Sequence, residues 1–111
     1  MKPEPPFKII PAGAAFEGTL CWSGEVRVEG QLRGDALGRG GLEIGPEAEV
    51  HGEVRADDLL VDGLLEGDAT AARRIELREG ARVVGDLRAP TVVLAEGCKL
   101  DGRLEITPKG D

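Results

Sequence analysis

The sequence contains one histidine, His51, and histidine is the side chain that most often acts as a general base near neutral pH. His51 stands between Val50 and Gly52, in a stretch where apolar and polar residues alternate. The alternation predicts that Val50 points inward and that His51 points to solvent. Carboxylates that could serve a polysaccharide lyase or hydrolase are matched around the surface by arginines. We therefore assign no catalytic residue and predict that the protein is not an enzyme.

A column of acidic residues is the second feature that could carry chemistry. Asp35, Glu53, Asp68 and Asp86 each follow a recurring glycine, while Thr19 and Arg103 take the same place near the two ends. Stacked carboxylates repel one another, and a calcium ion could relieve that repulsion. Alternatively, an acid after glycine simply favours a turn and is solvated. We expect the second reading, and we predict no metal and no cofactor.

Composition excludes several partners and compartments. The formal net charge is -7 and aromatic residues make up 3% of the chain, which argues against nucleic acid as a partner. No apolar run is long enough to cross a bilayer, and the N-terminus lacks the apolar stretch of a secretory signal, so we expect a cytoplasmic protein. Cys21 and Cys98 have no metal-ligand spacing and should be reduced thiols in that compartment.

The elements that position these residues come from one internal repeat. An apolar residue, any residue, glycine, a usually polar residue and a second apolar residue recur six times, with the glycines at 18, 34, 52, 67, 85 and 102. Each copy from the second onward follows a further apolar alternation, such as Val26-Arg27-Val28 or Leu42-Glu43-Ile44. One unit of about 17 residues therefore covers the chain.

Period-two alternation of this kind is typical of strands with one buried face. A unit of this length has room for two or three strands of three to five residues, which is one coil of a β-helix. The sequence thus predicts an all-β, single-domain parallel β-helix of about six short coils. A small β-sandwich or barrel is the alternative, but it predicts strands of unlike sequence joined by hairpins. The unequal spacing of the glycines favours a right-handed helix over a left-handed one, which prefers a step of 18.

The first and last coils differ from the others in the size of their inward residues. The position four residues after the glycine is occupied by Trp22 and Ile106 at the ends and by glycine or alanine between them. We predict that the ends form a polymerisation interface, through Phe16, Leu20 and Trp22 at one pole and Leu100, Leu104 and Ile106 at the other. The alternative is that terminal coils merely vary more.

From Phe16 to Ile106, six Val-x-Gly-x-Val/Leu repeats between short tails resemble the bactofilins. The stretch from Gly24 to Gly34 resembles the first coils of that family closely. The resemblance implies a right-handed β-helix that polymerises with itself, without nucleotide, into non-polar bacterial cytoskeletal filaments. The sequence agrees in lacking the Gly-Lys-Ser/Thr motif that cradles phosphates. The resemblance also implies a scaffold at the inner face of the cytoplasmic membrane. A monomeric binding module for a cell-wall enzyme is the rival function.

We expect a flexible Pro-rich tail at 1–13, the β-helix at 14–107 and a short C-terminal tail at 108–111. Two readings of the N-terminal segment stay open. In one, Ile10 and Ala12 simply cover the first coil. In the other, suggested by the family, Phe7, Ile9 and Ile10 insert into the membrane while Lys2 and Lys8 contact anionic headgroups.

Overall fold

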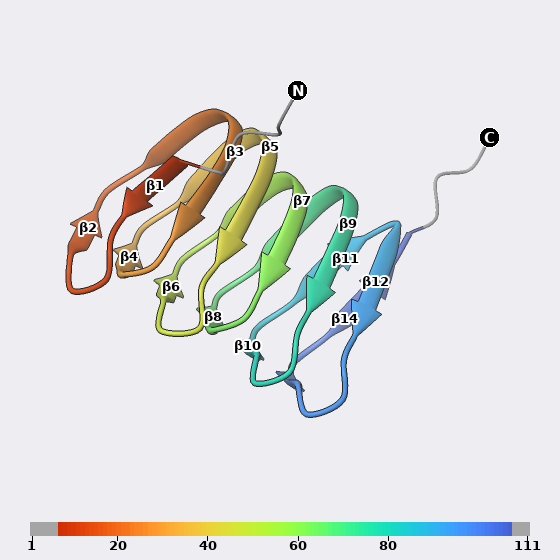
Figure 1. Ribbon diagram of the computed structural model, residues 1–111. Coiled ribbons are helices and arrows are strands. Elements are labelled where there is room, and N and C mark those ends of the chain that lie inside the picture. Colours follow the sequence, from red (N-terminus) through yellow and green to blue (C-terminus); the bar gives the residue numbers. More distant parts are fainter. Residues whose placement is uncertain (1–6, 108–111) are drawn as a thin grey trace, which may run out of the picture.

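The chain winds into one stack of parallel β-coils (Figure 1). The computed structural model describes the backbone of residues 7–107 and the side chains of residues 10–107. Every strand pair in this part of the chain is parallel, and it contains no helix. Both predictions, an all-β fold and a β-helix of about six coils, are confirmed.

Most coils contain one short strand and one long strand. Late in the chain, shorter strands take the place of the long one. The short strands are β2 (Ala15–Glu17), β4 (Gln31–Arg33), β6 (Glu49–His51), β8 (Leu64–Glu66), β10 (Arg82–Val84) and β13 (Lys99–Asp101). The remaining strands are β1 (Phe7–Ile10), β3 (Leu20–Val28), β5 (Ala36–Ile44), β7 (Val54–Val61), β9 (Ala69–Leu77), β11 (Leu87–Ala89), β12 (Thr91–Leu94) and β14 (Leu104–Ile106).

Two sheets result from this arrangement. The short strands form a six-stranded sheet in the order β13-β10-β8-β6-β4-β2. The others form an eight-stranded sheet in the order β1-β3-β5-β7-β9-β11-β14, with β12 also paired to β9. Because the long strands bend in the middle, the stack has three sides, one made of short strands and two made of the halves of the long strands.

The long strands differ from the shorter ones that the repeat predicts. In β3 and β5, two apolar alternations belong to one strand of nine residues, because the backbone bends between them without leaving the sheet. Gly24 and Gly40 form this corner with φ values of 106° and 112°. A Cβ on Gly40 would overlap the carbonyl oxygen of Gly24 in the coil below, so the corner needs glycine.

The core is a set of aliphatic columns inside the three sides. Leu32, Val50, Leu65 and Val83 stack under the short strands, and each is 0% exposed. Small residues fill the turns after the long strands: Ala48 and Ala81 are 1% exposed, and their N–H groups close tight turns by donating to Gly45 and Arg78. No polar or charged residue is buried in residues 10–107.

Strand β1 lies within the segment that the sequence suggested as an N-terminal tail. Its backbone pairs in parallel with β3, which sets Phe7 beside Val26 and Ile10 beside Val28. Ile10 is 3% exposed and belongs to the core, so its side chain continues the column of Val28 and Ile44. Of the two residues that the first reading named, Ile10 therefore covers the first coil, whereas Ala12 is exposed.

Candidate functional site: the two ends of the solenoid

Within the described residues, the first and last coils of the stack each have a neighbouring coil on one side alone. Inside the stack, the N–H after each short strand donates to a carbonyl of the following coil, as in Gly34 N–H to His51 O at 2.8 Å and Gly67 N–H to Val84 O at 2.8 Å. Within residues 7–107, nothing pairs with the outer edges of β1 and β2 or with those of β12, β13 and β14. Both ends therefore present unpaired backbone groups, which is a surface suited to further strands.

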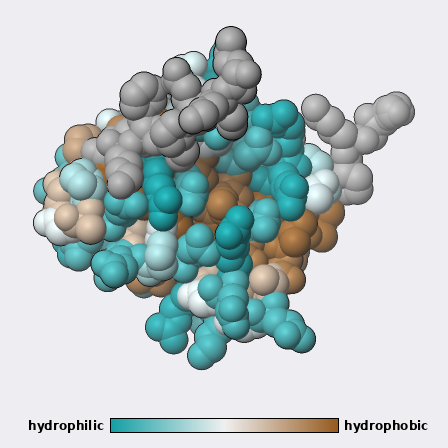
Figure 2. All heavy atoms as spheres, viewed as in Figure 1, coloured by the Kyte–Doolittle hydropathy of each residue, from teal (hydrophilic) through white to brown (hydrophobic). Residues whose placement is uncertain are grey.

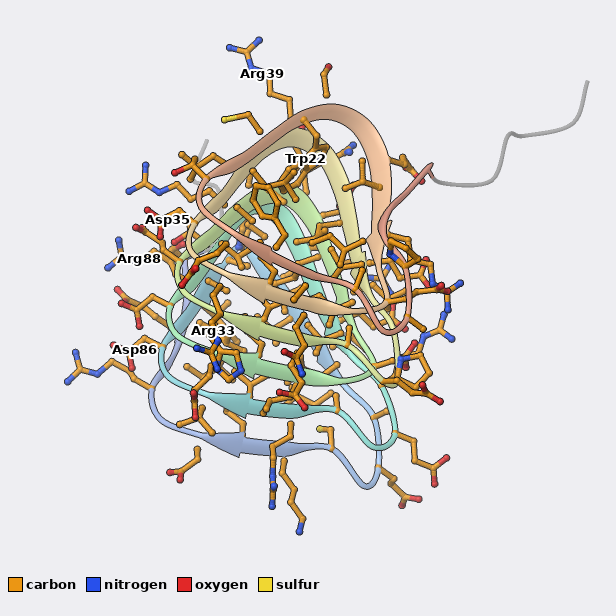
Figure 3. All side chains as sticks on the ribbon, turned by 90° about the vertical axis from the view of Figure 1, so that its left-hand side faces the viewer. Trp22, Arg33, Asp35, Arg39, Asp86 and Arg88 are labelled. Atoms are coloured by element: carbon orange, nitrogen blue, oxygen red, sulfur yellow. The ribbon has the colours of Figure 1, made fainter. Side chains whose placement is uncertain are left out.

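At the N-terminal end the exposed residues include apolar side chains and carry little charge. Phe16 is 37% exposed, and Leu20 and Trp22 are half-buried against the core. The Trp22 ring lies over Gly38, where a Cβ would overlap it, inside the curve of the first coil (Figure 3). From Ile10 to Gly24 the one charged residue is Glu17.

At the C-terminal end the inward columns run out to solvent. Ile106 is 52% exposed, while Leu100 and Leu104 are half-buried. Apolar side chains gather at the end where β12 lies (Figure 2). Among them is Leu94, which is 48% exposed and was not among the predicted interface residues. The sequence could have identified Leu94 as an interface residue. It occupies the same place in its alternation as Ile44, Val61 and Leu77, but no described coil follows to cover it.

The structure thus places Phe16, Leu20 and Trp22 in the first coil, at one pole, and Leu100, Leu104 and Ile106 in the last coil, at the other. The sides of the stack differ in character. They carry ion pairs between exposed groups, such as Arg55 with Glu53 at 3.2 Å and Arg73 with Asp58 at 2.6 Å. Charged sides keep coils soluble, whereas apolar ends favour association through the ends.

The acidic column has a backbone role. A carboxylate oxygen of Asp35 accepts from the N–H of Glu53 at 3.4 Å, Asp68 accepts from Asp86 at 3.3 Å, and Asp86 accepts from Arg103 at 3.2 Å. Each of these three aspartates therefore satisfies the N–H that follows the glycine in the next coil, whereas the Glu53 carboxylate accepts from Arg55 Nε at 3.2 Å. Asp35 and Asp86 lie along one edge of the stack (Figure 3). No group of three potential metal ligands occurs in the described part of the chain.

His51 and the two cysteines lie apart from one another in the fold. His51 Nδ1 lies 2.8 Å from Glu66 Oε1 and its Nε2 lies 3.5 Å from Glu49 Oε1, on the outer side of the short strands. Cys21 is on β3 in the first coil and Cys98 is in the turn before β13 in the last. Within residues 7–107, no helix is long and apolar enough to span a membrane.

The fold and its ends define a class of protein, a parallel β-solenoid that is open to further strands at both poles. Comparison with known proteins agrees: the family model for bactofilins, described as polymer-forming cytoskeletal, matches residues 8–105. The chain therefore belongs to the bactofilin family of polymer-forming cytoskeletal proteins. Among solved structures, it is similar to bactofilin from Thermus thermophilus in a cryo-EM reconstruction of double helical filaments. The two are 30% identical with a TM-score of 0.79, and the match covers 88% of this chain and 98% of the other. No significant match was found among curated protein sequences.

Proposed function

We propose that this protein builds a cytoskeletal filament by stacking its solenoids end to end, without nucleotide. The observation that carries the proposal is that both ends combine unpaired strand edges with exposed apolar residues, whereas the sides are charged. The Thermus thermophilus protein, which shares this fold, forms filaments, and this supports the proposal that the present chain polymerises. Stacking would continue each sheet and each apolar column from one molecule into the next.

The energetics favour the ends over any other surface. A strand edge offers hydrogen bonds that are regular and repeated, and a terminal coil adds apolar area worth roughly 25 cal/mol per Å² when buried. The family resemblance adds that the filament is non-polar. A non-polar filament requires each end to bind its like, so both poles must be self-complementary.

Substitution at the C-terminal end tests end-to-end assembly. Leu104→Arg or Ile106→Arg places a charge in the proposed contact, and burying it without a partner is costly. We expect short oligomers in place of filaments by negative-stain electron microscopy, with an unchanged β-rich circular dichroism spectrum. Thr70→Arg, on the exposed outer side of β9, is the matched control and should form normal filaments.

Filaments of normal length from both end variants would contradict this contact. A wild-type protein that stays a monodisperse species of 11.7 kDa would contradict the filament itself. That result would favour the rival function, a monomeric module that binds a cell-wall enzyme or another protein.

We further propose that the filament is a scaffold on the inner face of the cytoplasmic membrane. The support is the family resemblance together with the basic and apolar residues near the N-terminus. Burial of Ile10 in the core removes that residue from the anchor. Lys2 lies outside the described residues, as do the side chains of Phe7, Lys8 and Ile9, and these four remain the proposed contact.

A further inference from the structure

One side of the solenoid carries a hollow that lies away from both poles. The C-terminal halves of β3, β5, β7 and β9 run next to one another on this side, between β1 and β12 (Figure 1). We call their outer surface the long-strand face. Its hollow measures about 300 Å³ and is open to solvent. Residues of all four strands line it, so the stacking of coils fixes their relative positions.

Two rows of outward residues cross the long-strand face. One row holds Glu25, Gly41, Asp58 and Arg74, and the other holds Arg27, Glu43, Leu60 and Glu76. Neighbours in a row are one coil apart, about 4.8 Å. The first row has no side chain at Gly41, which is part of the lining of the hollow. Glu25 and Asp58 flank this place on the neighbouring coils, and Glu43 follows on the same strand.

The fold does not require a glycine at position 41. Gly40, the residue before it, forms the corner with a positive φ and has no room for a Cβ. Gly41 has no positive φ, and the nearest atoms to a Cβ there would be those of the Glu25 side chain, at 3.6 Å, which is an ordinary van der Waals distance. Glycine weakens the interior of a strand. Its effect at this place is to keep the hollow open.

The charge around the hollow is mainly negative. Its lining holds one cation and four anions, namely Arg74 with Glu25, Glu43, Asp58 and Glu76. Glu25 forms no ion pair with the other described residues, and Glu43 has only Arg27, at 3.6 Å. Asp58 and Glu76 have closer partners, Arg73 at 2.6 Å and Arg74 at 2.9 Å. Two carboxylates beside Gly41 therefore lack a close cation.

A cationic side chain fits this place. The backbones at Glu25 and Asp58 are two coils apart, about 9.6 Å, so a cation over Gly41 would lie between the two carboxylates. A guanidinium is the best match, because its planar fork has donors on both edges and can bridge two carboxylates. Leu60, which is half-buried on the neighbouring row, offers an apolar surface to the arginine stem or to an apolar residue beside it.

We propose that the long-strand face binds a basic segment of another protein, with an arginine in the hollow and an apolar residue on Leu60. Net charge selects this occupant. A second copy of the chain carries a formal net charge of -7 and would be repelled from an acidic hollow. Residues 1–6 of the same chain carry Lys2 and Glu4, whose charges cancel. A partner of net positive charge is attracted both by the hollow and by the acidic molecule around it.

This site goes beyond end-to-end assembly and does not depend on it. Each solenoid has one such hollow, so a filament would present the hollow at regular intervals. Partners with several basic segments would then bind a filament more tightly than a single solenoid, without any new contact.

A synthetic peptide tests the site. The probe is a fluorescein-labelled peptide of repeated Arg-Gly-Leu-Gly units, in which the glycine spacers point arginine and leucine to the same side of an extended chain. Fluorescence anisotropy with the full chain should show saturable binding of this probe. The same peptide with citrulline, a neutral isostere, in place of arginine should bind about tenfold more weakly or worse, because it cannot form charge-assisted hydrogen bonds.

Three variants locate the binding. Gly41→Thr fills the hollow and leaves every carboxylate in place, so it should weaken probe binding by about tenfold or more through steric conflict. Its melting temperature should be no lower than that of the wild type, because threonine favours strands. Glu25→Gln should weaken binding by about threefold, as expected for an exposed ion pair. Glu79→Gln removes the same charge from the exposed turn after β9 and is the matched control, which should bind like the wild type.

Several results would overturn the site. One is equal binding of the arginine and citrulline peptides, and another is equal binding by Gly41→Thr and the wild type. Equal losses from Glu25→Gln and Glu79→Gln would show that net charge alone attracts the probe. If Lys2→Glu raises the affinity for the probe, the N-terminal segment of the chain itself is the occupant and the assignment to another protein is wrong.

Filament length in electron microscopy is a separate readout. Gly41→Thr and Glu25→Gln should form filaments of wild-type length, because both positions lie away from the poles. If either change shortens the filaments or alters their width and leaves probe binding intact, the long-strand face contacts a second copy, and the proposal of a basic partner is wrong. Loss of probe binding with normal filaments supports it.

Discussion

At the scale of single residues, the glycine column determines how closely coils can stack. Gly34, Gly52, Gly67, Gly85 and Gly102 have φ values between 129° and 145°, and each Cα faces the carbonyl oxygen of the glycine one coil earlier. A Cβ at any of these positions would overlap that oxygen. Gly18 has no coil before it, and a Cβ there would meet only the Phe16 ring at 3.7 Å.

Gly67→Ala should therefore destabilise the solenoid strongly. The change adds the strain of a positive φ to a backbone clash in the middle of the stack, and we expect a loss of about 3 kcal/mol or more in the free energy of unfolding. Gly80→Ala is the control, since its φ is 90° but a Cβ there meets nothing within 4 Å. It should cost only about 1–2 kcal/mol. Thermal unfolding followed by circular dichroism measures both, and equal losses would show that the column is not tightly stacked.

At the scale of elements, the corner of the long strands shows how neighbouring coils of unequal length stay hydrogen-bonded. Three residues separate the inward positions Gly38 and Leu42 in β5, but only two separate Ala56 and Leu59 in β7, and the register shifts there. The Gly40 N–H consequently donates to a carboxylate oxygen of Asp57 at 2.9 Å, in place of a backbone carbonyl. A side chain thus replaces one missing rung of the ladder.

Removing the Asp57 carboxylate should lower the free energy of unfolding more than removing the neighbouring Asp58 carboxylate. Asp57→Ala leaves the partly buried Gly40 N–H without its acceptor, which we expect to cost about 1–3 kcal/mol. Asp57→Asn keeps an acceptor oxygen and should recover most of the loss. Asp58 pairs with the exposed Arg73, so Asp58→Ala should cost only about 0–1 kcal/mol. Urea unfolding of the three variants measures the order, and a larger loss from Asp58→Ala would refute this account of the corner.

The elements also show how far the sequence alone could go. Alternation and glycine spacing predict the coils and the inward columns, because burial of one strand face imposes period two on every coil. They do not reveal that Leu20 to Val28 is one strand, because a bend at Gly24 resembles a turn in sequence. The pairing of Phe7–Ile10 with β3 was left open, because one short alternation after a Pro-rich stretch carries little signal. The poles were predictable from Trp22 and Ile106, whereas the exposure of Leu94 depends on where the last coil ends.

At the scale of the whole molecule, the ends and the sides of the solenoid differ in character. The ends combine unpaired strand edges with apolar columns, and in the proposed filament they extend the polymer in one dimension. Contacts that are weak in one copy but repeat along a filament would make any attachment to a surface depend on prior assembly.

Membrane attachment should follow the same rule. A basic residue near an anionic surface contributes only about 1 kcal/mol, so a monomer with Lys2 and Lys8 would scarcely bind. Lys2→Glu combined with Lys8→Glu should abolish co-sedimentation of filaments with vesicles that contain anionic lipid, and Leu104→Arg should abolish it by preventing assembly. Point changes are preferable to deletion up to Pro11, because deletion would also remove β1 and uncover Val26 and Val28 of β3. If the doubly substituted chain forms normal filaments that still pellet with the vesicles, the N-terminal segment is not the anchor.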